Sequence, residues 1–271
     1  WQKRKAEAKK KIKDAAKKLI KIASKRLESK SYQINTNHTE YDKFCSTFPF
    51  VETDDQLNAI NDVINDFEKD TPSDRLIVGD VAFGKTEVII RALFLAAKSK
   101  IQSIVFVPTT LLSRQHYNNF IKRFNLFDIK VAEVSRLISQ KEKNEIYKEC
   151  AEGKIDILIG THALLSDKLS FKKLGLIIYD EEQKLGTIQK EKFKEIAPNA
   201  HVLALSATPI PRTLSMSLSG IRDLSLILTA PYERLAVRSY VTKFDTVTIS
   251  EAIKREIYGR RNGVYYVTPR K

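Results

Sequence analysis

Gly79-Asp80-Val81-Ala82-Phe83-Gly84-Lys85-Thr86 is the stretch of sequence that decides the fold. It follows the apolar run Leu76-Ile77-Val78 and opens a helical pattern over residues 85–98, which predicts a strand, a loop and a helix in succession. In this setting the G-x-x-x-x-G-K-[ST] spacing has a mechanism, because N–H groups of the loop and of the helix N-terminus point at one place and bind phosphate oxygens. A chance glycine turn before a helix is the alternative, and the flanking strand and helix disfavour it.

Two side chains of this loop have specific expected roles. Lys85 would reach the terminal phosphates of a nucleoside triphosphate, which also makes it a candidate catalytic residue, and the hydroxyl of Thr86 would bind the bridging Mg²⁺. The other loop residues expected to surround the phosphates are Gly79, Val81, Ala82, Phe83 and Gly84.

Composition limits the classes of protein that the 271 residues can form. An apolar fraction of 42% and a charged fraction of 30% are those of a globular protein with one large or two small cores. No apolar run approaches the roughly 20 residues of a membrane span, and the basic N-terminus lacks the apolar segment of a signal peptide. We therefore expect a cytoplasmic protein without a membrane partner. Cys45 and Cys150 have no metal-ligand spacing and are expected to be reduced thiols.

The formal net charge of +14 is concentrated at the N-terminus. Residues 1–30 hold thirteen Lys and Arg against three acidic residues, in one long helical pattern with a narrow apolar stripe. Such a basic helix could contact nucleic acid or a partner, but a linker helix that packs its stripe on its own protein is the simpler interpretation. The polar, aperiodic residues 31–47 then predict a linker.

A capped helix is expected after the linker. Thr53 has the residue type of an N-cap for a helix over residues 54–67. Phe48 and Phe50, which precede it, are either a hydrophobic anchor or one wall of a base pocket, because Gln56 can offer both a donor and an acceptor to an adenine edge.

Strands and helices then alternate along the chain. Helices are predicted over residues 85–98, 111–124 and 139–151, and strands over residues 103–107, 129–134, 155–160, 176–179 and 202–206. Near-continuous Ile, Val and Leu runs are typical of strands buried on both faces, so the sequence predicts an α/β fold with a parallel sheet covered by helices. Ligands of such folds bind at the carboxyl ends of the strands.

An acidic loop follows the predicted strand at residues 176–179. Adjacent carboxylates at the end of a buried strand are costly unless a cation or a reacting group uses them. Asp180 is expected to hold Mg²⁺ through water, opposite Thr86, and Glu181 to orient or deprotonate the water that attacks the terminal phosphate. A plain acidic surface loop is the alternative, which the phosphate loop disfavours.

Hydroxyl residues end three other predicted strands. Ser206 and Thr208 can bond to the acidic loop, most simply to Gln183, which would either couple phosphate loss to the rest of the chain or serve only as a rigid turn. At the other two strand ends, small hydroxyls and helix N-termini suit a nucleic-acid backbone, or act as helix caps. These candidate DNA contacts are Thr109, Thr110, Gly160, Thr161 and His162.

Together these motifs resemble the RecA-like first motor lobe of superfamily 2 helicases, a P-loop NTPase. The matching positions are Gln56 in the Q motif, residues 79–86 in motif I, 108–112 in Ia, 160–162 in Ib, 180–183 in II and 206–208 in III. Longer strings, such as Phe83-Gly84-Lys85-Thr86-Glu87-Val88 and Ala207-Thr208-Pro209-Ile210-Pro211-Arg212-Thr213-Leu214, resemble the family of bacterial transcription-repair coupling factors. The resemblance covers essentially the whole chain, and fork-regressing branched-DNA helicases are the second choice.

The resemblance implies an ATP-dependent double-stranded DNA translocase that acts on stalled RNA polymerase and couples transcription to nucleotide excision repair. Those protein partners would bind parts of the full-length protein outside this chain. It also implies ATP contacts at Gln56, Lys85 and Thr86, Mg²⁺ at Asp180 and catalysis at Glu181.

The resemblance further implies how the chain is divided. Residues 1–30 would be the basic linker helix, residues 48–230 the first RecA-like lobe, and residues 231–271 the truncated start of a second lobe. An arginine finger supplied by that second lobe is worth about 10³- to 10⁵-fold in comparable phosphoryl transfer. Without it, we expect nucleotide binding with little hydrolysis and no translocation.

Two residues depart from the family pattern. The family has Gly at the position of Ala82, where a methyl group would be crowded if the backbone angle φ were positive. It has His at the position of Gln183, which keeps a hydrogen-bonding side chain, so we expect the coupling role to survive.

Two other classes of function compete with this interpretation. A GTPase should show an Asn-Lys-x-Asp motif that reads the base, which is absent, and a small-molecule kinase would not need the pair Asp180-Glu181 together with Ser206 and Thr208. A scaffold with a vestigial nucleotide site is the non-enzymatic alternative, and Ala82 keeps it open.

Overall fold

The computed structural model describes residues 24–26, 28–207, 222–232 and 243–258. The chain divides into two compact units, residues 1–232 and residues 233–271. Most of the predicted basic helix lies outside the described residues, as does much of the segment at residues 231–271 that was expected to begin a second lobe. The second unit contributes α9 (Thr246–Tyr258), whose first turn donates backbone N–H groups to the carboxylate of Asp245.

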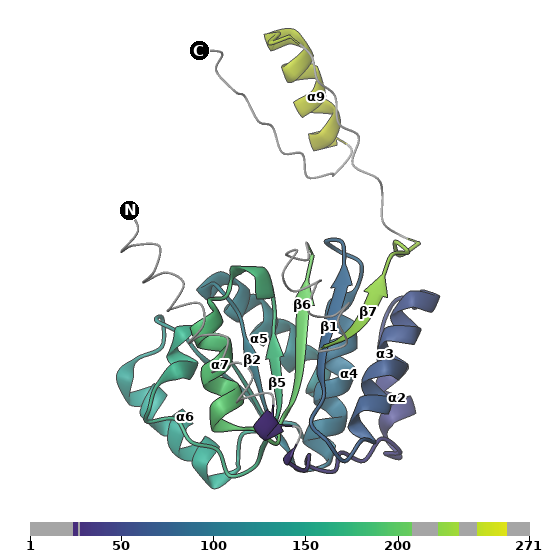
Figure 1. The fold of residues 1–271 in the computed structure, drawn as a ribbon. Helices are drawn as coiled ribbons and strands as arrows, with labels where there is room; N and C mark the ends of the chain where they lie inside the picture. Colours follow the sequence, from purple (N-terminus) through teal and green to yellow (C-terminus); the bar gives the residue numbers. More distant parts are fainter. Residues whose placement is uncertain (1–23, 27, 208–221, 233–242, 259–271) are drawn as a thin grey trace, which may run out of the picture. The chain divides into compact units, whose positions relative to one another are not determined.

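The first unit is built on one seven-stranded sheet in the order β3-β4-β2-β5-β6-β1-β7 (Figure 1). All six strand pairs are parallel. The strands are β1 (Asp74–Gly79), β2 (Gln102–Phe106), β3 (Val131–Val134), β4 (Ile157–Gly160), β5 (Leu174–Tyr179), β6 (His201–Ser206) and β7 (Asp223–Ile227). The predicted α/β fold with a helix-covered parallel sheet is confirmed.

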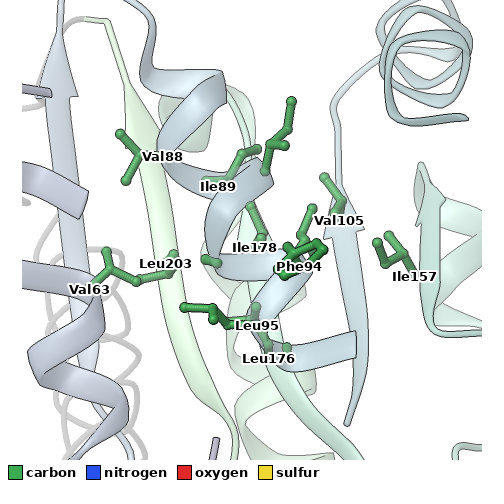
Figure 2. Close-up of a cluster of buried hydrophobic side chains, with 14 of the residues drawn as sticks. Val63, Val88, Ile89, Phe94, Leu95, Val105, Ile157, Leu176, Ile178 and Leu203 are labelled. Carbon is green, nitrogen blue, oxygen red and sulfur yellow. The ribbon is translucent and has the colours of Figure 1, made fainter. Parts of the chain in front are cut away.

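Helices cover both faces of the sheet, because alternate residues of the buried strands point to opposite sides. One face packs against α2 (Tyr41–Cys45), α3 (Asp54–Phe67), α4 (Lys85–Lys98) and α5 (Thr110–Phe124), and the other against α6 (Gln140–Glu152) and α7 (Thr187–Ile196). Figure 2 shows the core of the first face, where Ile89 and Phe94 of α4 lie among strand residues such as Val105 and Leu203. Two apolar faces explain the near-continuous apolar strands.

The helix boundaries follow local capping chemistry. Thr53 caps α3 as predicted, and its hydroxyl and the amide of Gln56 form a capping box. Ser139 caps α6 in the same way with Glu142. The end of α4 is closed by Lys100, which adopts a left-handed conformation and donates its N–H to Ala97.

Three α-helices or strands of the first unit were not expected from the sequence: α2, α7 and β7. Of these, α2 lies inside the predicted linker at residues 31–47, where Phe44 is buried in the core. In β7 the buried Ser225 breaks the apolar pattern, because its hydroxyl bonds to Asp62 and accepts from Arg75. Boundaries also differ by two residues, since β3 begins at Val131 and β5 at Leu174. None of the helices in the described ranges is long and apolar enough to cross a membrane.

Arg26 ties the start of the described chain to the sheet. Its guanidinium is buried and donates to the carbonyl oxygens of Ser73 at 3.0 Å and Pro198 at 3.3 Å. Residues 24–26 are helical, so this contact is of the kind expected for a linker helix that packs on its own protein.

Candidate functional site

Two glycines of the loop between β1 and α4 have positions that other residues would not fit. A Cβ atom on Gly79 would lie 2.9 Å from the carbonyl oxygen of Ile227 in β7, and one on Gly84 would lie 2.2 Å from Nε2 of Gln56. Gly84 also has a φ of 75° and is the N-cap of α4. The loop is therefore held close to its neighbours, with the N-terminus of α4 opening directly behind it.

Ala82 has a φ of 63°, in the left-handed region. This is the condition under which the sequence predicted a conflict with its methyl group. Its side chain is exposed, so the cost is torsional strain rather than a clash with the rest of the chain.

Lys85 turns back over the loop. Its ammonium donates to the carbonyl oxygens of Gly79 at 2.6 Å and Asp80 at 2.8 Å. Burial lowers the pKa of Lys85, and the carboxylates of Asp180, Glu181 and Asp80 act in the opposite direction. The phosphate loop and the acidic loop therefore converge, although β6 separates their strands in the sheet.

The acidic loop begins where β5 ends. One carboxylate oxygen of Asp180, Oδ1, accepts from the backbone N–H of Glu181 at 2.9 Å, while Oδ2 lies 2.7 Å from Nε2 of His116. Glu181 has a φ of 51°, a left-handed conformation that is strained for a non-glycine residue. Its Oε2 accepts from Nε2 of Gln183 at 2.8 Å and lies 3.2 Å from Nζ of Lys184.

Ser206 connects β6 to this loop. Its hydroxyl donates to Oε1 of Gln183 at 3.0 Å, which confirms the predicted hydrogen bond. Because Nε2 of Gln183 donates to Glu181, a continuous path runs from the end of β6 to the carboxylate expected to activate water. Thr208, the other residue expected on this path, lies outside the described residues.

Comparison with known proteins decides which group this arrangement belongs to. Residues 53–217 match the DEAD/DEAH box helicase family. The chain belongs to that family. Members of this family are ATP-hydrolysing helicases. In this chain, the phosphate loop and the acidic loop are the parts expected to bind and hydrolyse ATP.

The similarity to individual proteins extends over the whole chain. The chain is 50% identical, over 274 aligned residues, to the transcription-repair-coupling factor of Rickettsia typhi; the alignment covers 100% of this chain and 24% of that protein. Identity to the transcription-repair-coupling factor of Escherichia coli is 47%, over 98% of this chain and 23% of that protein. The chain thus spans about a quarter of the length of these relatives.

Solved structures support the same fold. The structure of RecG bound to a three-way DNA junction has a TM-score of 0.72 and 30% sequence identity, covering 89% of this chain and 32% of that one. The helicase MrfA bound to DNA and AMPPNP has a TM-score of 0.59 at 17% identity, over 84% of this chain and 36% of that one, a likeness of fold alone.

The helicase residues expected to contact the base are divided between exposed and buried positions. Phe50 is 52% exposed and meets Phe48 edge to face. Gln56 is buried, its Oε1 accepts from the N–H of Thr53, and its Nε2 donates to the carbonyl of Phe83 at 2.9 Å. The amide of Gln56 therefore braces the phosphate loop against α3, and its contact with adenine stays a prediction.

The residues expected to contact DNA lie at the ends of β2 and β4. Thr109 is exposed and its hydroxyl accepts from the N–H of Leu112, so it caps α5, which Thr110 begins. A Cβ atom on Gly160 would lie 2.5 Å from the carbonyl of Val134, which gives this glycine a packing role. Thr161 is buried, whereas His162 is exposed. The helix-cap alternative thus holds for Thr109, and the DNA contacts stay predictions.

The chemistry of the donor set fits ATP and Mg²⁺. The hydroxyl of Thr86 lies in the first turn of α4, and two carbonyl oxygens hold Lys85 beside the loop. Asp180 lies near enough to act electrostatically on that lysine. Within the described ranges no three His, Cys, Asp or Glu residues cluster as metal ligands. The expected magnesium site therefore combines the hydroxyl of Thr86 with oxygens from phosphate and water, and Asp180 would hold the metal through one of these waters.

Two side chains that contact the acidic loop were not found by sequence reasoning. His116 contacts Asp180 from α5, and Arg222 binds Glu182 through two contacts of 2.9 Å. Neither belongs to a sequence motif named above, and both reach the loop from distant parts of the chain. A buried carboxylate at Glu182 needs a cation, but the sequence does not show which cation supplies it.

Proposed function

We propose that this chain is the ATP-binding lobe of an ATP-dependent double-stranded DNA translocase that acts on stalled RNA polymerase and couples transcription to nucleotide excision repair. The observation that carries the proposal is the path from Ser206 through Gln183 to Glu181, next to Asp180 and the phosphate loop. A motor lobe needs a link of this kind between hydrolysis and the rest of the protein. Half-identity to transcription-repair-coupling factors supports the particular motor.

Each residue of the site has a defined task in this proposal. When ATP binds, the ammonium of Lys85 would give up its hydrogen bonds to the two loop carbonyls and donate to the terminal phosphate oxygens instead. N–H groups at the start of α4 would bind the same phosphates. Thr86 and Asp180 hold Mg²⁺, which neutralises charge on the phosphates when bound. Oε1 or Oε2 of Glu181 accepts a proton from the attacking water, and Gln183 keeps that carboxylate in place.

The partners follow from the same proposal. Double-stranded DNA would lie across the exposed edge where β2 and β4 end, with contacts to its phosphates at Thr109, Thr110 and His162. RNA polymerase and excision repair proteins would bind other parts of the full-length protein, which would work in the bacterial cytoplasm.

Nucleotide titration tests the ATP-binding step. A fluorescent ATP analogue with Mg²⁺ should bind the wild-type chain, and Lys85→Ala should weaken the affinity by at least tenfold, because a charge-assisted contact of about 1.5–3 kcal/mol is lost. Lys154→Ala, which removes an exposed lysine paired with Glu152, is the matched control and should leave the affinity unchanged. Equal affinity for the wild type and Lys85→Ala would instead favour a scaffold with a vestigial site.

A fork-regressing branched-DNA helicase is the second candidate, favoured by the likeness to RecG on a three-way junction. Binding of the chain to linear duplex and to a three-way junction of equal length separates the two. Equal affinities that fall steeply with salt would fit a translocase that holds the duplex backbone. A clear preference for the junction would favour the second candidate.

A further inference from the structure

His116 holds the carboxylate expected to bind magnesium. Its Nε2 lies 2.7 Å from Oδ2 of Asp180, and the side chains of His116 and Asp180 are only 9% and 14% exposed. The other oxygen of Asp180 accepts the N–H of Glu181. Two donors on two different oxygens fix the plane of the carboxylate, which a single donor would leave free to rotate.

The direction of this hydrogen bond follows from the chemistry of its partners. An ionised carboxylate can only accept, so Nε2 of His116 carries the proton that lies between them. Each oxygen of a carboxylate has a second lone-pair position. Asp180 can therefore keep both donors and still accept from a water molecule bound to Mg²⁺.

The imidazole itself is held on a rigid element. His116 packs on Phe120, with ring centroids 5.4 Å apart, and Phe120 is fully buried in the core. One turn further along α5, Arg123 donates to Glu87 of α4 at 2.8 Å. The helix that carries His116 and the helix that begins at Lys85 are therefore joined by a partly buried ion pair, which helps to fix the position of the histidine relative to the phosphate loop.

We propose that His116 is a positioning residue that orients Asp180 for Mg²⁺, so that the metal-dependent part of nucleotide affinity depends on α5. This inference rests on the proposed function, because it assumes that Asp180 binds the metal. Removal of a group that helps to orient the surroundings of a bound metal typically changes metal affinity by 10- to 100-fold. Because α5 starts at the predicted DNA-contacting residues Thr109 and Thr110, the same histidine would connect that edge to the metal site.

The test compares nucleotide affinity with and without metal. The dissociation constant of a fluorescent ATP analogue is measured for the 271-residue chain in EDTA and in saturating Mg²⁺, and the ratio gives the gain due to the metal. His116→Leu removes the donor and keeps an apolar side chain against Phe120. We expect its affinity in EDTA to stay within twofold of wild type, and its gain from Mg²⁺ to fall by about 10- to 100-fold.

Two further variants separate positioning from packing. His116→Gln should restore most of the gain, since the glutamine amide can place an N–H near the position of Nε2. Gln115→Ala, an exposed neighbour on α5, should change neither affinity. In an Asp180→Asn background, His116→Leu should have no additional effect on the gain.

The outcomes distinguish this inference from the function on which it rests. A wild-type chain without nucleotide binding, or without a gain from Mg²⁺, would refute the proposed site and with it the role of His116. A normal gain in His116→Leu would refute the positioning role alone. An equal loss of affinity in EDTA and in Mg²⁺ would show that the histidine only supports the fold, as would failure of His116→Gln to recover any gain.

Discussion

Replacing Ala82 by glycine should raise the free energy of unfolding of the first unit. Ala82 has a φ of 63° in the phosphate loop, and its exposed methyl group makes no buried contact that the substitution would remove. Glycine adopts this left-handed conformation without the steric penalty that a Cβ atom imposes. The change therefore removes strain from the folded state and leaves its packing unchanged.

The size of the effect is a difference between two opposing contributions. A left-handed conformation costs an alanine roughly 1–2 kcal/mol. Glycine, in turn, gives the unfolded chain more conformational entropy, which lowers the free energy of unfolding by about 0.4–1 kcal/mol. We expect a net stabilisation of about 0.5–1 kcal/mol, which corresponds to a rise in Tm of about 1–4 °C for a domain of this size.

Urea denaturation followed by circular dichroism measures this change, and two matched variants fix its sign. Lys100→Gly relieves the same kind of strain at a φ of 57°, far along the chain from the loop, and should also stabilise. Gly84→Ala does the opposite at a φ of 75°, where the new Cβ atom would lie 2.2 Å from Nε2 of Gln56. A destabilising effect of Ala82→Gly together with stabilisation by Lys100→Gly would refute the left-handed assignment of Ala82.

Two other substitutions test buried charge. Arg222→Ala removes both contacts of the guanidinium with buried Glu182, which keeps Lys190 at 3.1 Å, and should lower the free energy of unfolding by about 1.5–3 kcal/mol. The control Lys154→Ala, at an exposed pair, should change it by less than about 1 kcal/mol in urea denaturation. Burial lowers the pKa of His201 from 6.5 to about 4. Between these two pH values the imidazole is protonated in the unfolded chain and neutral in the folded chain. The free energy of unfolding should then fall by up to about 3 kcal/mol as the pH drops from 6.5 to 4. His201→Gln should flatten this part of the profile, and an unchanged slope would contradict the assignment.

Much of the first unit could be predicted because its signals are local. The loop at Gly79–Thr86, the cap at Thr53 and the apolar runs of β2 and β6 each depend on a few neighbouring residues, and each was predicted at or near its observed position. The hydrogen bond from Ser206 to Gln183 was also predictable. Ser206 ends β6, and Gln183 lies in the loop that follows the neighbouring parallel strand β5. Parallel topology brings such ends together without further information.

The elements that sequence reasoning missed depend on distant partners. No strand was predicted at β7, whose apolar pattern Ser225 interrupts, and the burial of Ser225 is explained only by Arg75 and Asp62, which lie far earlier in the chain. Gln56 looked free to read a base, yet its amide is occupied by Thr53 and by the carbonyl of Phe83. No short pattern could show these contacts, because they arise only when separate elements pack together.

The sequence by itself determined the candidate site: a glycine loop with Lys85 and Thr86, two carboxylates after a buried strand, and a hydroxyl that bonds to the amide of Gln183 beside them. These assignments depend on residue type and spacing, which can be read from the sequence whatever the arrangement of the surrounding elements. Only the tertiary structure decided how the parts are oriented. It places His116 of α5 on Asp180, gives Ala82 its strained left-handed conformation, and sets Arg222 against Glu182. Orientation depends on packing among elements far apart in sequence, and that packing is what a linear pattern cannot contain.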